Sequence, residues 1–124
     1  MVKNISRDEL VKIMNSGRKF KLVDVLTKES YEKEHIKGAL SIPLDQIEKE
    51  AAQMLKKDDL IITYCASFEC PASTKAAEKL ISLGYPSVLD YKGGLKDYKQ
   101  ASLPMEGSLF AKKSKNNSSC GCCS

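Results

Sequence analysis

The sequence predicts an α/β fold in which helices cover both faces of a mostly parallel central sheet. Short segments rich in β-branched residues alternate along the chain with segments of helical pattern, which favours this class. Residues 60–64, Leu-Ile-Ile-Thr-Tyr, have almost no polar alternation, as is typical of a strand covered on both faces. Because crossovers between parallel strands are right-handed, the helices are expected on both faces of the sheet.

The first predicted element is a helix opened by a capping box. Ser6 is followed three residues later by Glu9, the spacing at which each side chain caps the other residue's backbone amide. Apolar residues recur at helical spacing after this box, and Gly17 marks the expected end of the helix. A strand over residues 20–25 is predicted next.

Shorter elements are predicted between this strand and the central one. Residues 27–33 are expected to form a short helix, and a turn at Gly38 leads into a brief strand. Asp45 and Glu48 have the spacing of a second capping box, so a helix is predicted over residues 45–55.

The central strand brings Cys65 to its carboxyl end, and a helix follows from about Pro71. Proline suits the first helical turn, where its missing N–H would have no intrahelical partner. Gly84 lies where a helix commonly ends in a left-handed residue. The remaining predicted elements are a strand over residues 87–90, a turn at Gly93 and Gly94, and a helical segment over residues 95–100.

Composition limits the classes of function. A chain of 124 residues with 42% hydrophobic and 29% charged residues is expected to form one globular domain. No apolar run is long enough to cross a bilayer and no apolar leader precedes the domain, so we expect no membrane partner and a cytoplasmic location. The net charge of +4 comes from lysines scattered among acidic residues, which argues against a nucleic-acid partner.

The composition changes near the C-terminus. We predict a domain over residues 1–107 and a flexible tail over residues 108–124, rich in Lys, Asn and Ser. The tail ends in a cysteine cluster, Cys120, Cys122 and Cys123, which could bind a soft metal ion or have no role. Three sulfurs are too few for a closed tetrahedral zinc site, so no metal site is predicted.

Cys65 is the candidate nucleophile. Ligands of parallel sheets bind beyond the carboxyl ends of the strands, and a sulfur placed there lies near loop amides and the positive end of a helix dipole. These groups favour the thiolate, so the pKa of Cys65 is expected to be lowered. The alternative is that Cys65 is a small buried apolar residue.

Several motifs in order resemble the rhodanese-like domains. They are Asp24-Val25-Leu26, Glu34-His35-Ile36-Lys37-Gly38-Ala39, Ile42-Pro43, the strand Ile62-Thr63-Tyr64-Cys65, and Gly93-Gly94 with Tyr98. The resemblance covers residues 6–107. It implies a sulfurtransferase that moves sulfane sulfur from thiosulfate or a similar donor, through a persulfide on Cys65, to a thiol or cyanide acceptor.

The resemblance also implies what surrounds the persulfide. Backbone amides of the loop would hold it, and the loop residues are Ala66, Ser67, Phe68, Glu69 and Cys70. No cofactor is required, and the expected partners are a small sulfur-containing substrate and a thiol-bearing acceptor protein. Cys120, Cys122 and Cys123 of the tail could also accept sulfur from Cys65.

The chain departs from the family pattern at several positions. Leu26 stands where the family usually has Arg, and Tyr98 stands where it usually has Trp. The loop is about two residues longer than usual, a feature of the phosphatase and arsenate-reductase branch of this fold. That branch needs an Arg to bind a tetrahedral dianion, and Pro71 occupies its position here. A cysteine-dependent phosphatase or arsenate reductase is therefore a disfavoured alternative, beside a non-catalytic carrier of sulfur or metal.

Three further residues carry alternatives. Cys70 is either an inert residue at the helix start or a resolving thiol that attacks the persulfide or forms a disulfide with Cys65. His35, the only histidine, is expected to be structural because the resemblance places it in a turn. Asp24 is expected to be a hydrogen-bonded structural carboxylate rather than a general acid.

Overall fold

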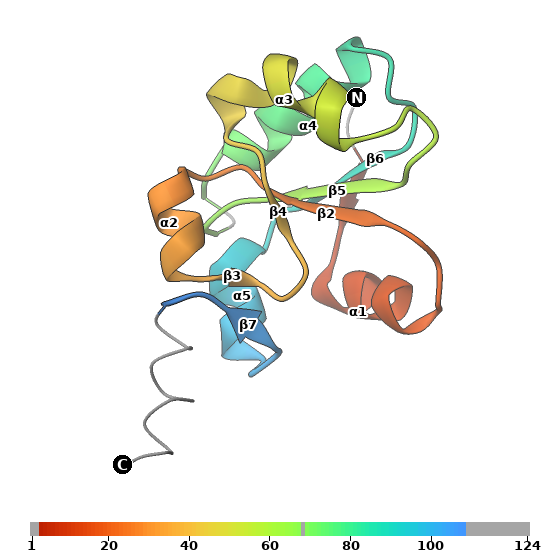
Figure 1. Cartoon of the computed structure of the whole chain (residues 1–124). Coiled ribbons are helices and arrows are strands. Elements are labelled where there is room, and N and C mark those ends of the chain that lie inside the picture. Colours follow the sequence, from red (N-terminus) through yellow and green to blue (C-terminus); the bar gives the residue numbers. More distant parts are fainter. Residues whose placement is uncertain (1–2, 68, 109–124) are drawn as a thin grey trace.

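A computed structural model describes residues 3–67 and 69–108 and centres on a five-stranded sheet (Figure 1). The strand order is β1-β6-β5-β2-β4, and every neighbouring pair is parallel. The predicted parallel sheet is confirmed, and β5 is its middle strand. The strands are β1 (Lys3–Ile5), β2 (Lys21–Asp24), β4 (Leu40–Ser41), β5 (Ile61–Tyr64) and β6 (Val88–Tyr91).

Helices cover both faces of this sheet, as predicted. In Figure 1, α3 (Ile47–Met54) and α4 (Ala72–Ser82) lie on one face, and α1 (Arg7–Asn15) and α5 (Gly94–Gln100) lie on the other. The other described elements are the short helix α2 (Lys28–Lys33), the 3₁₀ turn η1 (Leu44–Gln46), and an antiparallel pair of β3 (His35–Ile36) with β7 (Met105–Glu106).

The sheet separates two apolar cores, and β5 contributes to both. Ile61 and Cys65 pack in the core beneath α3 and α4, whereas Ile62 and Tyr64 pack in the core beneath α1 and α5. All four residues of β5 are buried, because successive side chains of a strand point to opposite faces and both faces are covered. Each fully buried Ile contributes roughly 2 kcal/mol of stabilisation, so the strand that carries Cys65 is among the firmest parts of the fold.

The two predicted capping boxes have different outcomes. At α1, Ser6 Oγ accepts from the Glu9 amide at 3.2 Å, and Glu9 Oε1 accepts from the Ser6 amide at 3.0 Å, so the first box is confirmed. The second box, at Asp45 and Glu48, is wrong. The Leu44 amide donates to the carbonyl of Val25 at 3.1 Å, which draws the chain into η1, and α3 begins afterwards without a side-chain cap.

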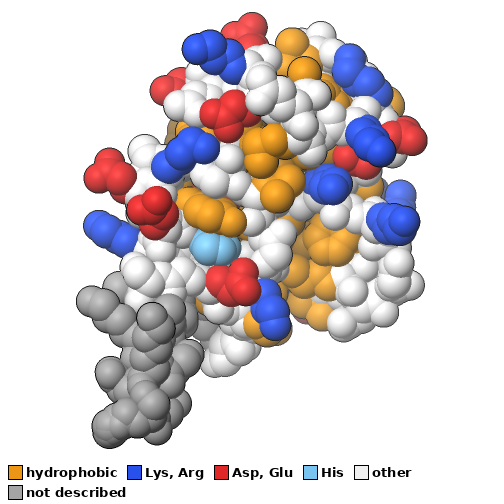
Figure 2. Space-filling view, viewed as in Figure 1, with side chains coloured by type: hydrophobic (Ala, Val, Ile, Leu, Met, Phe, Trp, Pro, Cys, Tyr) orange, Lys and Arg blue, Asp and Glu red, His pale blue; other side chains and the backbone are white. Residues whose placement is uncertain are grey.

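Three short strands, β1, β3 and β7, were not predicted. Each is only two or three residues long and exists by pairing, β1 with β6 and β7 with β3. No helix within the described ranges is long and apolar enough to cross a membrane. On the face seen in Figure 2, positive and negative side chains are interspersed rather than separated into patches of one sign.

Candidate active site

The loop after β5 is anchored at its start by the first amides of α5. The amide of Leu95 donates to the carbonyl of Cys65 at 2.9 Å, and the amide of Lys96 donates to the carbonyl of Ala66 at 2.9 Å. Gly94 makes this approach possible: its φ is +62°, and a Cβ at this position would overlap the Cys65 carbonyl oxygen. The predicted Gly-Gly turn therefore positions the backbone of the candidate nucleophile.

Buried polar side chains hold the first turn of α4 over the ends of β5 and β6. Thr63 Oγ1 donates to the carbonyl of Ser73 at 3.0 Å, and Thr74 Oγ1 donates to Asp90 Oδ2 at 2.6 Å. Thr63 and Asp90 are fully buried and face each other across the two strands. Sequence reasoning missed both of these residues, although polar side chains near the ends of otherwise apolar strands were a signal for them.

Carbonyl groups surround the sulfur of Cys65 in this conformation. The side chain is fully buried, and its thiol lies 3.3 Å from the carbonyl oxygen of Cys70 and 3.9 Å from that of Ser67. Burial raises the pKa of Cys65, and contact with the Cys70 thiol raises it further. The expected lowering of the pKa is therefore wrong for this conformation, because a thiol can donate to carbonyl oxygens and a thiolate cannot.

Ser73 supplies the groups that oppose this effect. Its amide and its hydroxyl both contact the Cys65 sulfur and act to lower the thiol's pKa. The hydroxyl is buried and has no nitrogen or oxygen partner within the described residues. It is thus a donor left free for a thiolate or a persulfide on Cys65.

Cys70 has the surroundings that were expected for Cys65. It is a free, half-buried cysteine. Burial alone would raise its pKa, but hydrogen bonds from the Cys65 thiol and from the amides of Ala72 and Ala66, with the charge of Lys92, lower the pKa overall. Lys92 lies in the connection between β6 and α5 and donates to Thr74 Oγ1 at 3.1 Å. Sequence reasoning found no basic residue in the loop and missed this lysine.

The predicted cradle of loop amides is not arranged around Cys65 in this conformation. The amide of Ala66 is directed at the sulfur of Cys70, and the amide of Cys70 donates to the carbonyl of Ser67 at 3.1 Å. Phe68 lies outside the described residues. A cradle for a Cys65 persulfide therefore remains a prediction for the loaded loop.

A cleft opens beside the loop, between Ala66 and Ser67 on one side and α5 on the other. Its volume is about 490 Å³, and Lys96 and Lys99 line it. Glu34 holds Lys99 by contacts of 2.9 and 3.0 Å. Lys96 is exposed and pairs with no carboxylate in the described part of the chain. The cleft thus offers a free cation near the loop.

The sequence profile of the rhodanese-like domain matches residues 6–101. The chain belongs to the rhodanese-like family. It is 38% identical over 76 residues to a thiosulfate sulfurtransferase, PspE of Escherichia coli, in a match that covers 60% of this chain and 70% of that protein. It is 30% identical over 97 residues to the putative sulfur carrier protein YrkF of Bacillus subtilis, covering 78% of this chain and 51% of that protein.

Solved structures agree with this placement. The rhodanese-like domain of the Alr3790 protein from Anabaena superposes with a TM-score of 0.80 at 28% identity, covering 90% of this chain and 84% of that one. The family-level resemblance drawn from the motifs is therefore confirmed, together with the fold.

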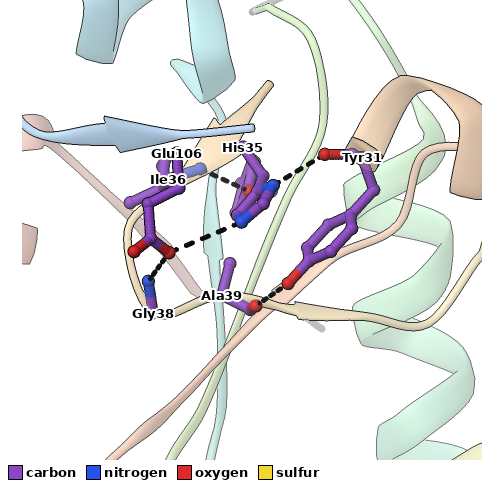
Figure 3. Close-up of polar contacts among 7 residues, drawn as sticks. Tyr31, His35, Ile36, Gly38, Ala39 and Glu106 are labelled. Carbon is purple, nitrogen blue, oxygen red and sulfur yellow. Dashed lines mark hydrogen bonds and ion pairs between the residues drawn. The ribbon is translucent and has the colours of Figure 1, made fainter. Parts of the chain in front are cut away.

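His35 serves this rhodanese-like domain as a structural link (Figure 3). Its ring stacks on Tyr31 with centroids 3.7 Å apart, Nδ1 lies 2.6 Å from the Tyr31 carbonyl oxygen, and Nε2 lies 3.5 Å from Glu106 Oε1. Tyr31 donates through its hydroxyl to the carbonyl of Ala39 at 2.5 Å. Both ring nitrogens are engaged, which supports the structural interpretation of His35.

Asp24 is also held within the rhodanese-like fold. It is fully buried, its Oδ1 accepts from the amide of Leu26 at 2.9 Å, and burial raises its pKa. These contacts support the structural interpretation of Asp24.

The structure does not describe the tail cysteines. Cys120, Cys122 and Cys123 lie outside the described residues. Within residues 3–67 and 69–108, no three His, Cys, Asp or Glu side chains come together as a metal site would require.

Proposed function

We propose that this rhodanese-like domain is a sulfurtransferase that uses Cys65 as its nucleophile. The Cys65 thiolate attacks the outer sulfur of thiosulfate or a similar donor, and sulfite leaves with the electron pair of the broken bond. An acceptor thiolate or cyanide then removes the outer sulfur and restores the thiolate. The observation that carries the proposal is the place of Cys65, at the carboxyl end of the middle strand and beside the first turn of α4.

Two changes would stabilise the negative charge on the Cys65 thiolate: movement of the loop and hydrogen bonds from Ser73. When Cys65 loses its proton it can no longer donate to the carbonyls of Ser67 and Cys70, so these carbonyls must turn away and the loop must move. The amide and the free hydroxyl of Ser73 then donate to the sulfur. Loop movement also gives the donor access to a side chain that is fully buried at rest.

The cleft beside the loop is the proposed approach for the donor. Thiosulfate is a dianion, and Lys96 is a cation that is not held by a carboxylate of the described residues. The same cleft could receive a thiol-bearing acceptor protein. A reducing, cytoplasmic setting suits a chain that carries five cysteines, of which the two described ones are free thiols.

Two rival functions can be distinguished from a sulfurtransferase. Pro71 argues against a phosphatase or arsenate reductase, and turnover would exclude a carrier. Pro71 lies at the start of α4, where a phosphatase or arsenate reductase of this fold would need Arg, so the loop has no group that binds a dianion bidentately. The name of YrkF describes that protein as a putative sulfur carrier. A carrier without catalytic activity would accept sulfur once and would not turn over.

The test measures loading and turnover together. Full-length protein is incubated with thiosulfate and its intact mass is measured, then turnover is followed with thiosulfate and cyanide. We expect one added sulfur on the Cys65 peptide at early times, and repeated turnover. Cys65→Ser should abolish both, and Cys70→Ser should retain loading as the matched control. Loading of the Cys65→Ser variant at the wild-type level would refute the assignment, and loading without turnover would favour the carrier.

A further inference from the structure

We propose that Cys70 discharges the Cys65 persulfide inside the loop, releasing hydrosulfide and leaving a Cys65–Cys70 disulfide. The inference rests on the proposed function, because Cys65 must first be loaded. It adds a second reaction, the reductive release of sulfur as hydrosulfide without an external acceptor.

The geometry places the two thiols in one another's reach. The Cys65 sulfur is 3.3 Å from the Cys70 carbonyl oxygen, and the two cysteines are close enough for each thiol to shift the pKa of the other. The bond from the Cys70 amide to the Ser67 carbonyl curls the loop so that residues five positions apart meet. Both cysteines are free in this structure. An attack from Cys70 therefore needs no second molecule.

The surroundings of Cys70 favour a thiolate. The amides of Ala66 and Ala72 and the charge of Lys92 face its sulfur, and together with the Cys65 thiol they lower its pKa. Lys92 is kept in place by Thr74, which is itself bonded to the buried Asp90. The two amides and Lys92 therefore favour the thiolate of Cys70, the thiol that lies beside the loaded sulfur.

Cys70 reaches the Cys65 persulfide more easily than an external thiol does. Cys65 is fully buried, whereas Cys70 is half-buried and already in contact with it. An external thiol must wait for the loop to open, but Cys70 moves with the loop. Tethering of this kind corresponds to an effective concentration of the order of millimolar or more, so the internal reaction competes well with dilute acceptors.

The chemistry balances without any group beyond a reductant. The Cys70 thiolate attacks the inner sulfur of the persulfide, a Cys65–Cys70 bond forms, and the bond to the outer sulfur breaks. That sulfur leaves with the electron pair as hydrosulfide. A dithiol reductant then supplies two electrons and two protons to restore both cysteines. The net reaction converts thiosulfate and a dithiol into sulfite, hydrosulfide and a disulfide.

The test uses the full-length chain in which Cys120, Cys122 and Cys123 are all changed to Ser, so that only the loop thiols remain. Its partner in the comparison carries Cys70→Ser as well. Each protein receives one equivalent of thiosulfate without reductant, and free hydrosulfide and intact mass are followed. We expect the parent to release hydrosulfide and lose two hydrogens, with a peptide linking Cys65 to Cys70. Cys70→Ser should retain the persulfide and release hydrosulfide at least about 10-fold more slowly.

The outcomes are distinguishable. A persulfide that decays equally fast in both proteins, or a parent that forms no linked peptide, overturns this inference and leaves the proposed sulfurtransferase standing. If neither protein acquires sulfur, both proposals fall.

A second pair of variants tests the role of Lys92. Lys92→Gln should move the pH dependence of hydrosulfide release to higher pH, whereas Lys49→Gln, an exposed change on α3, should not. An unmoved profile in Lys92→Gln would remove the lysine from the mechanism.

Discussion

Two groups of polar side chains in this fold differ in how completely they satisfy one another. Around His35, both ring nitrogens, the Tyr31 hydroxyl and one Glu106 oxygen all have partners, including the amide of Gly38 at 3.2 Å (Figure 3). Around Cys65, the Ser73 hydroxyl and Asp90 Oδ1 are buried without partners in the described residues.

Asp24 Oδ2 and Ser41 Oγ are also buried without partners in the described residues, so the difference concerns only the His35 cluster and the Cys65 site. A buried polar group left without a partner costs about 1–3 kcal/mol, so a fold keeps one only where something compensates. The ring nitrogens of His35 and the hydroxyl of Tyr31 already have partners, so they are not free to bind a ligand. Around Cys65 and Cys70, a hydroxyl donor and two thiols are left free. These groups can therefore stabilise a negative charge when it forms on the sulfur of Cys65.

The largest expected effect comes from the residue that fixes the loop. Gly94→Ala should destabilise the protein by about 2–4 kcal/mol and abolish loading of Cys65, because its Cβ would overlap the Cys65 carbonyl and its φ is positive. Gly38→Ala is the matched control. Its φ is +87° and a Cβ there would meet nothing within 4 Å, so only the backbone strain of about 1 kcal/mol should appear. Urea unfolding and mass measurement check both, and equal losses would contradict the role of Gly94.

The free hydroxyl gives the next largest effect. Ser73→Ala should slow loading of Cys65 by about 10-fold, since a donor to the thiolate is lost, while stability is unchanged or slightly higher because no existing hydrogen bond to nitrogen or oxygen is removed. Single-turnover loading with thiosulfate and unfolding by urea measure the two quantities. A stability loss with normal loading would reverse the assignment and make Ser73 structural.

Changes in the His35 cluster should lower stability and leave the loading of Cys65 unchanged, the reverse of Ser73→Ala. His35→Phe keeps a ring to stack on Tyr31 but loses both ring nitrogens, so the free energy of unfolding should fall by about 1 kcal/mol. Loading of Cys65 should stay within about 2-fold of wild type. Glu106→Gln should retain loading in the same way. A large loss of sulfur transfer in a well-folded His35→Phe protein would break the comparison, because His35 would then belong to the chemistry.

How much of this could be predicted from sequence depended on whether the signal was local. The strand that carries Cys65 was predicted because its residues are apolar without alternation, and the box at Ser6 was predicted because both partners lie within one turn. Asp45 and Glu48 had the same local signal, but a backbone bond from Leu44 to Val25, nineteen positions earlier in the chain, decided the geometry there.

The electrostatics of the site could not be predicted because they depend on distant groups. Cys65 lies at the end of the strand as expected, yet burial and the neighbouring Cys70 thiol raise its pKa. The amide of Ala72 and the charge of Lys92, which comes from another part of the chain, act on Cys70, whereas Ser73 alone lowers the pKa of Cys65. Sequence position located the thiols but did not show which of them is acidic.

The opposite pKa shifts of the two thiols predict a smaller effect on stability. Cys65 has a raised pKa, so as pH rises above the ordinary value for a cysteine the unfolded chain loses this proton first, and the free energy of unfolding falls. Between pH 7 and pH 9 the loss from this group should be below about 1 kcal/mol. Urea unfolding at both pH values, compared with Cys65→Ala, isolates it. A slope that is the same in the variant would mean that the pKa of Cys65 is not raised in the folded protein.

The smallest expected effect concerns the cleft beside the loop and a second hollow that shares Ser67 and Lys96 with it. The prediction compares two charges of opposite sign. Lys96 on α5 and Glu69 in the loop are both exposed and line the same hollow beside Ser67. Lys96→Gln should raise the KM for thiosulfate by about 3-fold, since one favourable charge acting through water is lost, and Glu69→Gln should lower it by a similar factor. Both effects should fade as salt is raised, because exposed charges are screened, whereas kcat stays unchanged since neither group touches the reacting sulfur. Lys49→Gln provides the charge-matched control on α3. If all three variants shift KM equally, the effect is one of net charge, and the cleft is not the path by which the donor reaches Cys65.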